Sequence, residues 1–114
     1  MVISQGDIWW TNLPDPVSSG PGSRRPILVI QGDALNRSRI QTVVCVPLTS
    51  NLGYAQAPGN VPLRLRYTGL PKDSIANVSQ IVALDRTLPT ERTGKLPRTQ
   101  FDLVLSGIDV VLGR

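Results

Sequence analysis

The chain has 114 residues, carries 12 Lys+Arg against 8 Asp+Glu for a formal net charge of +4, and contains no histidine. The missing imidazole excludes Ser-His-Asp, Cys-His and paired-His chemistry, and the single cysteine, Cys45, excludes an intramolecular disulfide and a zinc cluster. No apolar run approaches the ~18 residues of a membrane span, and the N-terminus lacks the charged-then-apolar layout of a signal peptide. We therefore expect one domain over residues 1–114, without membrane contact, in the reduced cytoplasm.

The segment Ser4–Leu13 predicts a strand, because it is rich in residues that favour extended structure. Alternation along it places Ile8 and Trp10 on one face and Trp9 and Thr11 on the other. A tryptophan at the head of a strand either packs in a core or lies at the surface, where it can stack on a nucleobase. We expect one of the two tryptophans in the core and the other at a surface or loop.

Two loops and two buried strands come next. Pro14–Ser23 and Asn51–Asn60 are rich in Pro, Gly and small polar residues, a composition typical of surface loops. Pro26–Gln31 and Thr42–Leu48 are nearly unbroken apolar runs, which predicts strands that are buried on both faces. Between these strands, Gly32–Arg39 is a short polar segment in which Asp33 can cap one helical turn ahead of Asn36.

The second half of the chain predicts further strands and one helix. Val61–Tyr67 alternates cleanly, which predicts a half-exposed strand with Arg64 and Arg66 pointing outward. Ser74–Leu84 predicts one bent strand or two short ones, and Leu96–Leu112 carries the apolar stripe of a helix. Many short strands with one terminal helix predict a mainly β (α+β) fold, a small, highly curved antiparallel sheet or barrel capped by a helix.

Short sequence blocks follow one another along nearly the whole chain. They are Gly6-Asp7-Ile8-Trp9-Trp10, Arg25-Pro26-Ile27-Leu28-Val29-Ile30-Gln31, Pro47-Leu48-Thr49-Ser50, Lys72-Asp73-Ser74, Gln80-Ile81 and Asp85-Arg86. In this order and at this spacing, the blocks resemble the PemK/MazF toxins. The resemblance implies an SH3-like, CcdB/MazF-like curved antiparallel β-barrel with a C-terminal α-helix. It also implies a homodimeric toxin of a type II toxin–antitoxin pair, which cuts single-stranded RNA at short sequences without metal or cofactor and is blocked by an acidic antitoxin.

Arg25 and Thr49 are the candidate catalytic pair. Cleavage of RNA by attack of its own 2′-hydroxyl needs no metal, but arginine, hydroxyl and backbone groups must then neutralise the charge on the phosphorane. Pro26 holds the preceding Arg25 in extended geometry at the end of a loop, and Thr49 lies where a buried strand emerges. The matching Arg and Thr are catalytic in the family, so the resemblance assigns these roles to Arg25 and Thr49.

Five further residues are candidates for contact with the RNA. Ser50 either contacts RNA or forms a plain turn, and Asn51 follows it directly. Arg24 is either a phosphate contact or a solubilising charge. Gln80 resembles a family residue that reads RNA, but a satisfied polar group in a strand explains it equally well. Asn36 follows a pattern that relatives share, and a local helix cap explains it at least as well.

The identity of the general base and two alternative functions stay open at this level. Many relatives carry an acidic residue just before the glutamine, where this chain has Ser79, and some use a loop histidine that is absent here. A non-catalytic RNA-binding barrel that uses the basic segment Val61–Tyr67 is the first alternative. The second is a gyrase-poisoning toxin of the same fold. Such toxins depend on a C-terminal Trp-Gly-Ile, which the ending Val111-Leu112-Gly113-Arg114 lacks.

Overall fold

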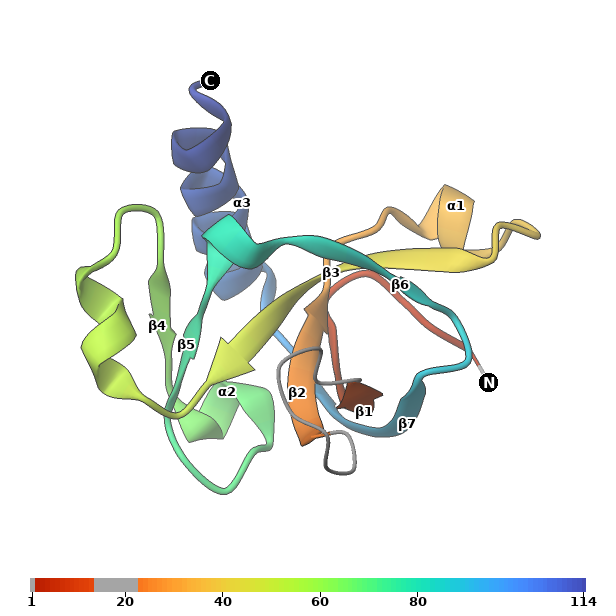
Figure 1. Ribbon diagram of the computed structural model, residues 1–114, viewed down its shortest axis with the longest axis horizontal. Coiled ribbons are helices and arrows are strands. Elements are labelled where there is room, and N and C mark those ends of the chain that lie inside the picture. Colours follow the sequence, from red (N-terminus) through yellow and green to blue (C-terminus); the bar gives the residue numbers. More distant parts are fainter. Residues whose placement is uncertain (1, 14–22) are drawn as a thin grey trace.

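The strands on either side of residues 14–22 form the middle of one curled antiparallel sheet (Figure 1). The computed structural model describes residues 2–13 and 23–114, so the predicted loop Pro14–Ser23 lies outside the described residues except for Ser23, where a strand begins. The strands are β1 Asp7–Leu13, β2 Ser23–Val29, β3 Thr42–Thr49, β4 Val61–Leu63, β5 Ser74–Ala76, β6 Val82–Asp85 and β7 Pro89–Lys95. The helices are α1 Asp33–Asn36, α2 Leu65–Thr68 and α3 Arg98–Leu112, with 3₁₀ turns η1 Leu52–Gln56 and η2 Val78–Gln80.

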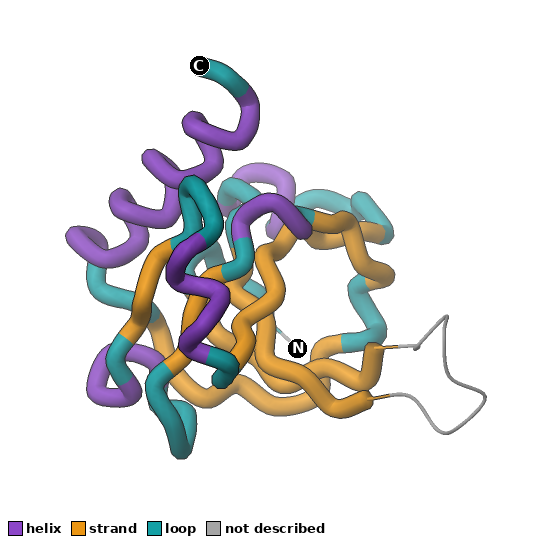
Figure 2. The backbone as a smooth tube through the Cα atoms, turned by 60° about the vertical axis from the view of Figure 1, so that its left-hand side comes forward, coloured by secondary structure: helices purple, strands orange, loops and turns teal. Residues whose placement is uncertain are grey.

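The sheet is continuous because β3 pairs with three other strands. Its order is β4-β5-β3-β2-β1-β7, and β6 also pairs with β3. The first half of β3 pairs with β6, and its last two residues, Leu48 and Thr49, pair with β5. Figure 2 shows how the strands curl into an incomplete barrel, with α3 outside it. The curved antiparallel sheet with a C-terminal helix confirms the fold predicted from the sequence.

Two apolar clusters fill the two faces of this sheet. Cross-strand pairing sets Ile8 opposite Leu28 and Trp9 opposite Ile27, so that neighbouring residues alternate between the faces. Ile8 and Leu28 belong to the larger cluster, which also holds Phe101 and other residues of α3, whereas Trp9 and Ile27 belong to the smaller one. Trp9 is buried and Trp10 is only half-buried. The predicted faces of β1 and the expectation of one core tryptophan are therefore confirmed.

The predicted strand Val61–Tyr67 is wrong beyond Leu63, because β4 ends there and α2 begins at Leu65. The backbone N–H of Leu65 donates to a carboxylate oxygen of Asp73 at 2.8 Å, which starts the helical turn. Gly69, with φ of 75°, ends it in the left-handed region and packs against the backbone of β7. The apolar alternation that suggested a strand fails at Leu65, whose side chain is exposed.

Strand β7 is a second difference, since no strand was predicted at Pro89–Lys95. Most of its residues are exposed and polar, so the segment has no apolar alternation that could reveal it. Its partner is β1, which begins more than eighty residues earlier in the chain. By contrast, the prediction of one bent strand or two short ones in Ser74–Leu84 is confirmed in its second form, because the structure has two short strands, β5 and β6, separated by η2.

Helix α3 confirms the predicted C-terminal helix, although it begins two residues later than expected. Pro97 is the residue before the first helical turn, and Gly113 ends the helix in the left-handed region. Phe101, Val104 and Ile108 are buried on its inner face. No helix in the described part of the chain is long and apolar enough to cross a bilayer.

Candidate active site

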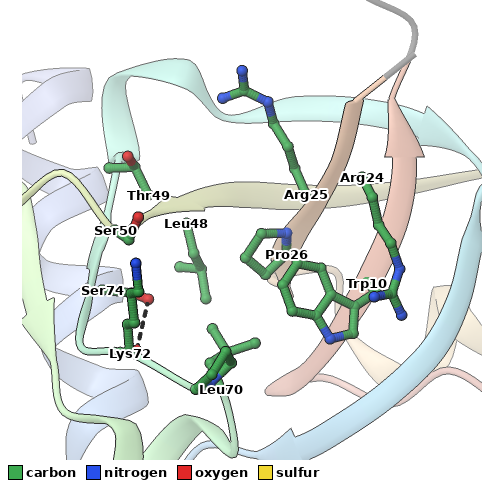
Figure 3. A pocket seen from close by; sticks show the side chains of 11 residues that line it. Trp10, Arg24, Arg25, Pro26, Leu48, Thr49, Ser50, Leu70, Lys72 and Ser74 are labelled. Carbon is green, nitrogen blue, oxygen red and sulfur yellow. Dashed lines mark hydrogen bonds between the residues drawn. The ribbon is translucent and has the colours of Figure 1, made fainter. Parts of the chain in front are cut away.

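A pocket of about 380 Å³ opens at the point where β2 and β3 separate (Figure 3). The two strands pair as far as Ile27 opposite Pro47. If this pairing continued for two more residues, Arg25 would lie opposite Thr49. At this point β3 pairs instead with β5, where Thr49 lies opposite Ile75. The divergence leaves space between the ends of β2 and β3, and both candidate catalytic residues line that space.

The pocket has an apolar floor and a cationic rim. Its apolar lining residues are Trp10, Pro26, Leu48, Leu70 and Pro71. Its polar lining residues are Arg24, Arg25, Thr49, Ser50, Lys72 and Ser74. Three of these polar residues are cations, and no carboxylate of the described residues lines the pocket. An anion with an attached flat apolar group is the kind of ligand that such a lining favours.

The hydroxyl of Thr49 is held by the turn that follows β3. The backbone N–H of Asn51 donates to Thr49 Oγ1 at 3.1 Å, and Asn51 Oδ1 accepts from the backbone N–H of Gly53 at 3.1 Å. The side chain of Asn51 therefore caps η1, and its backbone N–H fixes the position of Thr49 Oγ1. Because the hydroxyl oxygen already accepts a hydrogen bond, its own O–H is left to donate to a ligand.

The two adjacent arginines are in different surroundings. Arg24 Nη2 forms an ion pair with Glu91 Oε2 at 2.8 Å, and its guanidinium carbon lies 4.5 Å from the centre of the Trp10 ring. Arg25 is exposed, and it forms no ion pair with a carboxylate of residues 2–13 or 23–114. Figure 3 shows the two guanidinium groups pointing in opposite directions from β2. Among the described residues, Arg25 is therefore the pocket arginine whose charge no carboxylate compensates.

Ser50 also lines the pocket, whereas Asn51, Asn36 and Gln80 lie outside its lining. The buried Asn36 donates through Nδ2 to the carbonyl oxygen of Gln31 at 2.8 Å and accepts through Oδ1 from Gln31 Nε2 at 2.9 Å. Gln80 is exposed at the end of η2. The structure therefore brings Arg24, Arg25, Thr49 and Ser50 together but places Asn36 and Gln80 elsewhere.

The predicted cap of α1 takes a different form from the one expected. Gly32 occupies the N-cap position without a side-chain hydrogen bond, and Asp33 is the first helical residue. The carboxylate of Asp33 accepts from the backbone N–H of Gln5 at 2.7 Å and from Asn36 Nδ2 at 3.1 Å. These two hydrogen bonds hold the pKa of Asp33 below its ordinary value. Asp33 and Asn36 thus tie α1 to the N-terminal segment.

Sequence reasoning missed Lys72, Ser74 and Glu91. Lys72 and Ser74 line the pocket rim from the turn before β5 and from the start of that strand. Both residues belong to the sequence block Lys72-Asp73-Ser74, so the family resemblance could have indicated them. Glu91, the partner of Arg24, lies on the unpredicted strand β7, so no sequence signal connected it to the site.

The family model of the PemK-like, MazF-like toxins of type II toxin-antitoxin systems matches residues 4–112, so the chain belongs to this family of curled-sheet proteins. The chain is 46% identical over 112 residues to Endoribonuclease MazF6 of Mycobacterium tuberculosis strain H37Rv, with 98% of each chain covered. It is 29% identical to Endoribonuclease EndoA of Bacillus subtilis, covering 98% of this chain and 96% of that one. The recognition of a toxin–antitoxin endoribonuclease family from the sequence blocks is confirmed.

Solved structures agree with the fold. A MazE–MazF structure from Deinococcus radiodurans superposes with a TM-score of 0.80 at 24% identity, covering 99% of this chain and 97% of that one. A mycobacterial endoribonuclease in complex with its cognate antitoxin gives a TM-score of 0.75 at 19% identity, covering 97% and 95%.

Proposed function

We propose that this chain is the toxin of a type II toxin–antitoxin pair and acts as a metal-independent, sequence-specific endoribonuclease on single-stranded RNA. The observation that carries the proposal is that Arg25 and Thr49, at the diverging ends of β2 and β3, line the same cationic pocket. Membership of the family and the name endoribonuclease given to relatives support the same reaction. Growth inhibition then follows from cleavage of RNA needed for translation.

The reaction is an attack of the RNA 2′-oxygen on the adjacent phosphorus. The bond from phosphorus to the 5′-oxygen breaks, which gives a 2′,3′-cyclic phosphate and a 5′-hydroxyl. Arg25 donates hydrogen bonds to the non-bridging oxygens, whose charge grows in the transition state, and the Thr49 hydroxyl donates a further one. Water accepts the proton of the 2′-hydroxyl and returns one to the 5′-oxygen, because arginine does not deprotonate in proteins.

The other candidate residues have distinct places in this proposal. Ser50 contacts the RNA at the pocket rim, where Lys72 also attracts a phosphate. Asn51 is a positioning residue, because it holds Thr49 Oγ1 through its backbone N–H. Gln80 and Asn36 lie outside the pocket lining and are left out of the reacting centre.

The proposal extends to partners and location. One solved relative is a MazE–MazF structure, and another is an endoribonuclease in complex with its cognate antitoxin. We expect the pocket of this chain to accept an acidic antitoxin segment, because Arg25 and Lys72 on its rim form no ion pair with a carboxylate of the described residues. The whole chain would act as one toxin domain, as a homodimer, in the cytoplasm.

Incubation with a long RNA in the presence of EDTA tests the reaction. We expect discrete fragments with 5′-hydroxyl and cyclic phosphate ends, whose mapped sequences define the cleavage site. Arg25→Ala should abolish cleavage and keep the circular dichroism spectrum, whereas the control Arg39→Ala, at an exposed position outside the pocket, should cleave normally. Activity that EDTA removes, or full activity of Arg25→Ala, would disprove the mechanism. Binding without fragments would favour a non-catalytic RNA-binding barrel.

A further inference from the structure

Three neighbouring strands each contribute one side chain to a layered cluster beside the catalytic pair. Trp10 lies on β1, Arg24 on β2 and Glu91 on β7. Trp10 is directly opposite Glu91 across one strand pair, and Arg24 occupies the diagonal position across the other. The guanidinium lies over the indole while Glu91 holds its Nη2 atom. We call this set the Trp10–Arg24–Glu91 layer.

The ion pair changes what Arg24 can offer to RNA. A carboxylate at 2.8 Å compensates the charge of the guanidinium and would repel a phosphate brought close to it. One planar face of the guanidinium lies against the Trp10 ring, and the Arg24 side chain is 52% exposed, which leaves the opposite face for a ligand. Guanidinium planes and aromatic rings are the surfaces on which unpaired RNA bases stack. Arg24 is thus better suited to a base than to a phosphate, the reverse of Arg25.

The position of the layer specifies which base it would meet. Trp10 and Arg24 line the same pocket as Arg25 and Thr49. If Arg25 and Thr49 hold the reacting phosphate, then a nucleotide attached to that phosphate reaches the Trp10 side of the pocket. Trp10 is half-buried against the core, and the ion pair restrains Arg24, so little conformational freedom is lost when a base stacks there.

We propose that the Trp10–Arg24–Glu91 layer is the platform on which the nucleobase next to the scissile phosphate stacks. Arg24 provides the stacking surface, Trp10 supports it from below, and Glu91 is a positioning residue that holds Arg24 flat. This inference rests on the proposed ribonuclease function, since it places the base by reference to the reacting phosphate. It assigns the adjacent arginines different tasks: Arg25 binds the phosphate and Arg24 binds the base.

The first test measures binding of a random-sequence pool of short single-stranded oligodeoxyribonucleotides, which lack the 2′-hydroxyl and are not cleaved. Arg24→Lys keeps the charge but loses the planar surface, so it should weaken binding roughly 5- to 100-fold, the range for loss of one stacked base. The slope of log K against log salt should not change. A phosphate contact predicts the opposite: Arg24→Lys binds like the wild type, and Arg24→Gln lowers the slope by about 0.7. Either of those results would overturn the platform.

The second test separates positioning from catalysis. Glu91→Gln should raise the KM for RNA cleavage and leave kcat unchanged, because the layer does not touch the reacting atoms. The matched control is Asp102→Asn, which removes the carboxylate of another exposed arginine pair, Arg98–Asp102 on α3, and should change neither constant. A fall in kcat with constant KM for Glu91→Gln, or an equal effect of the control, contradicts the positioning role.

A spectroscopic readout follows binding without any dependence on cleavage. The variant Trp9→Phe keeps Trp10 as its single tryptophan, and its emission should change when the oligodeoxyribonucleotide pool binds. Unchanged emission at saturation would overturn the proposal. A change of emission together with the Arg24→Lys loss, but without cleavage of any RNA, would keep the platform and remove the ribonuclease. Cleavage of RNA without the change of emission and without the Arg24→Lys loss of binding would keep the ribonuclease and remove the platform.

Discussion

Thr49 shows how one backbone hydrogen bond decides what a side chain offers to a substrate. Its hydroxyl oxygen accepts the N–H of Asn51 through one of its two lone pairs, so the hydroxyl proton can be donated to a ligand. A residue with the same shape but no hydroxyl keeps the packing and removes that donor. Replacement of Thr49 therefore tests the role of a single hydroxyl group.

Thr49→Val should lower the single-turnover rate of RNA cleavage by about 10²- to 10³-fold, the usual effect of losing one transition-state hydrogen-bond donor. Thr49→Ser should keep most of the rate, because it keeps the hydroxyl. Thermal unfolding of both variants serves as the control for folding. A Thr49→Val variant as fast as the wild type would remove Thr49 from the catalytic pair.

Burial makes Cys45 unreactive. Its side chain is fully buried, its thiol faces the Val82 carbonyl oxygen with Sγ at 3.6 Å, and burial raises the thiol pKa from 9.0 to about 12. We expect no modification by thiol reagents in the folded protein and full modification in denaturant.

Because the fold favours the neutral thiol of Cys45, the contribution of this thiol to stability is complete below pH 9.0 and is lost as pH rises from there towards about 12. Urea unfolding of wild type and Cys45→Ala across that range measures this loss, which the variant should lack.

At the scale of elements, the docking of α3 depends on two glycines. A Cβ atom added to Gly107 would collide with the carbonyl oxygen of Gly59, in the loop before β4. Gly59 itself has a φ of 84°, which favours glycine there. The helix can therefore approach the loop only because both residues lack side chains.

Gly107→Ala should lower the free energy of unfolding by about 1–3 kcal/mol, the cost of forcing atoms into a packed contact. Helix propensity alone would favour the alanine, so the sign of the change is informative. Ser106→Ala, one residue away and exposed, is the control and should be neutral or slightly stabilising. Denaturant unfolding measures both variants, and a stabilised Gly107→Ala would contradict the contact.

The elements also show how far the sequence could predict the molecule. Buried strands such as β2 and β3 were predictable because continuous apolar runs identify them. Strand β7 was not, because its pairing with β1 depends on residues distant in the chain and its own residues are mostly exposed. Arg25 and Thr49 were found through local context and family resemblance. The link between Arg24 and Glu91 needed the register of three strands, which no local pattern contains.

For the whole molecule, a net charge of +4 favours RNA in general, but only cations free of carboxylates bind its phosphates strongly. Of the four ion pairs in the described residues, one engages Arg24, and none engages Arg25 or Lys72. Overall charge therefore overstates the number of phosphate contacts.

Lys72→Gln should lower the slope of log K against log salt by about 0.7 for single-stranded nucleic acid, because one phosphate contact is lost. Equilibrium binding across a series of salt concentrations measures the slope. Lys95→Gln, outside the pocket lining, is the control and should leave the slope nearly unchanged. Equal slopes for Lys72→Gln and the wild type would show that Lys72 does not contact phosphate.

The pairing of β1 with β7 also sets an order of events during synthesis. The residues that line the pocket are all made by Ser74, yet β1 remains an unpaired edge until Pro89–Lys95 has been made. Glu91 joins Arg24 only at that stage. A growing chain thus carries both candidate catalytic residues, Arg25 and Thr49, before it carries the strand that completes the sheet. The pairing of β1 with β7 is therefore the last strand contact that the order of the chain allows, and it completes a sheet whose other six strands are already made.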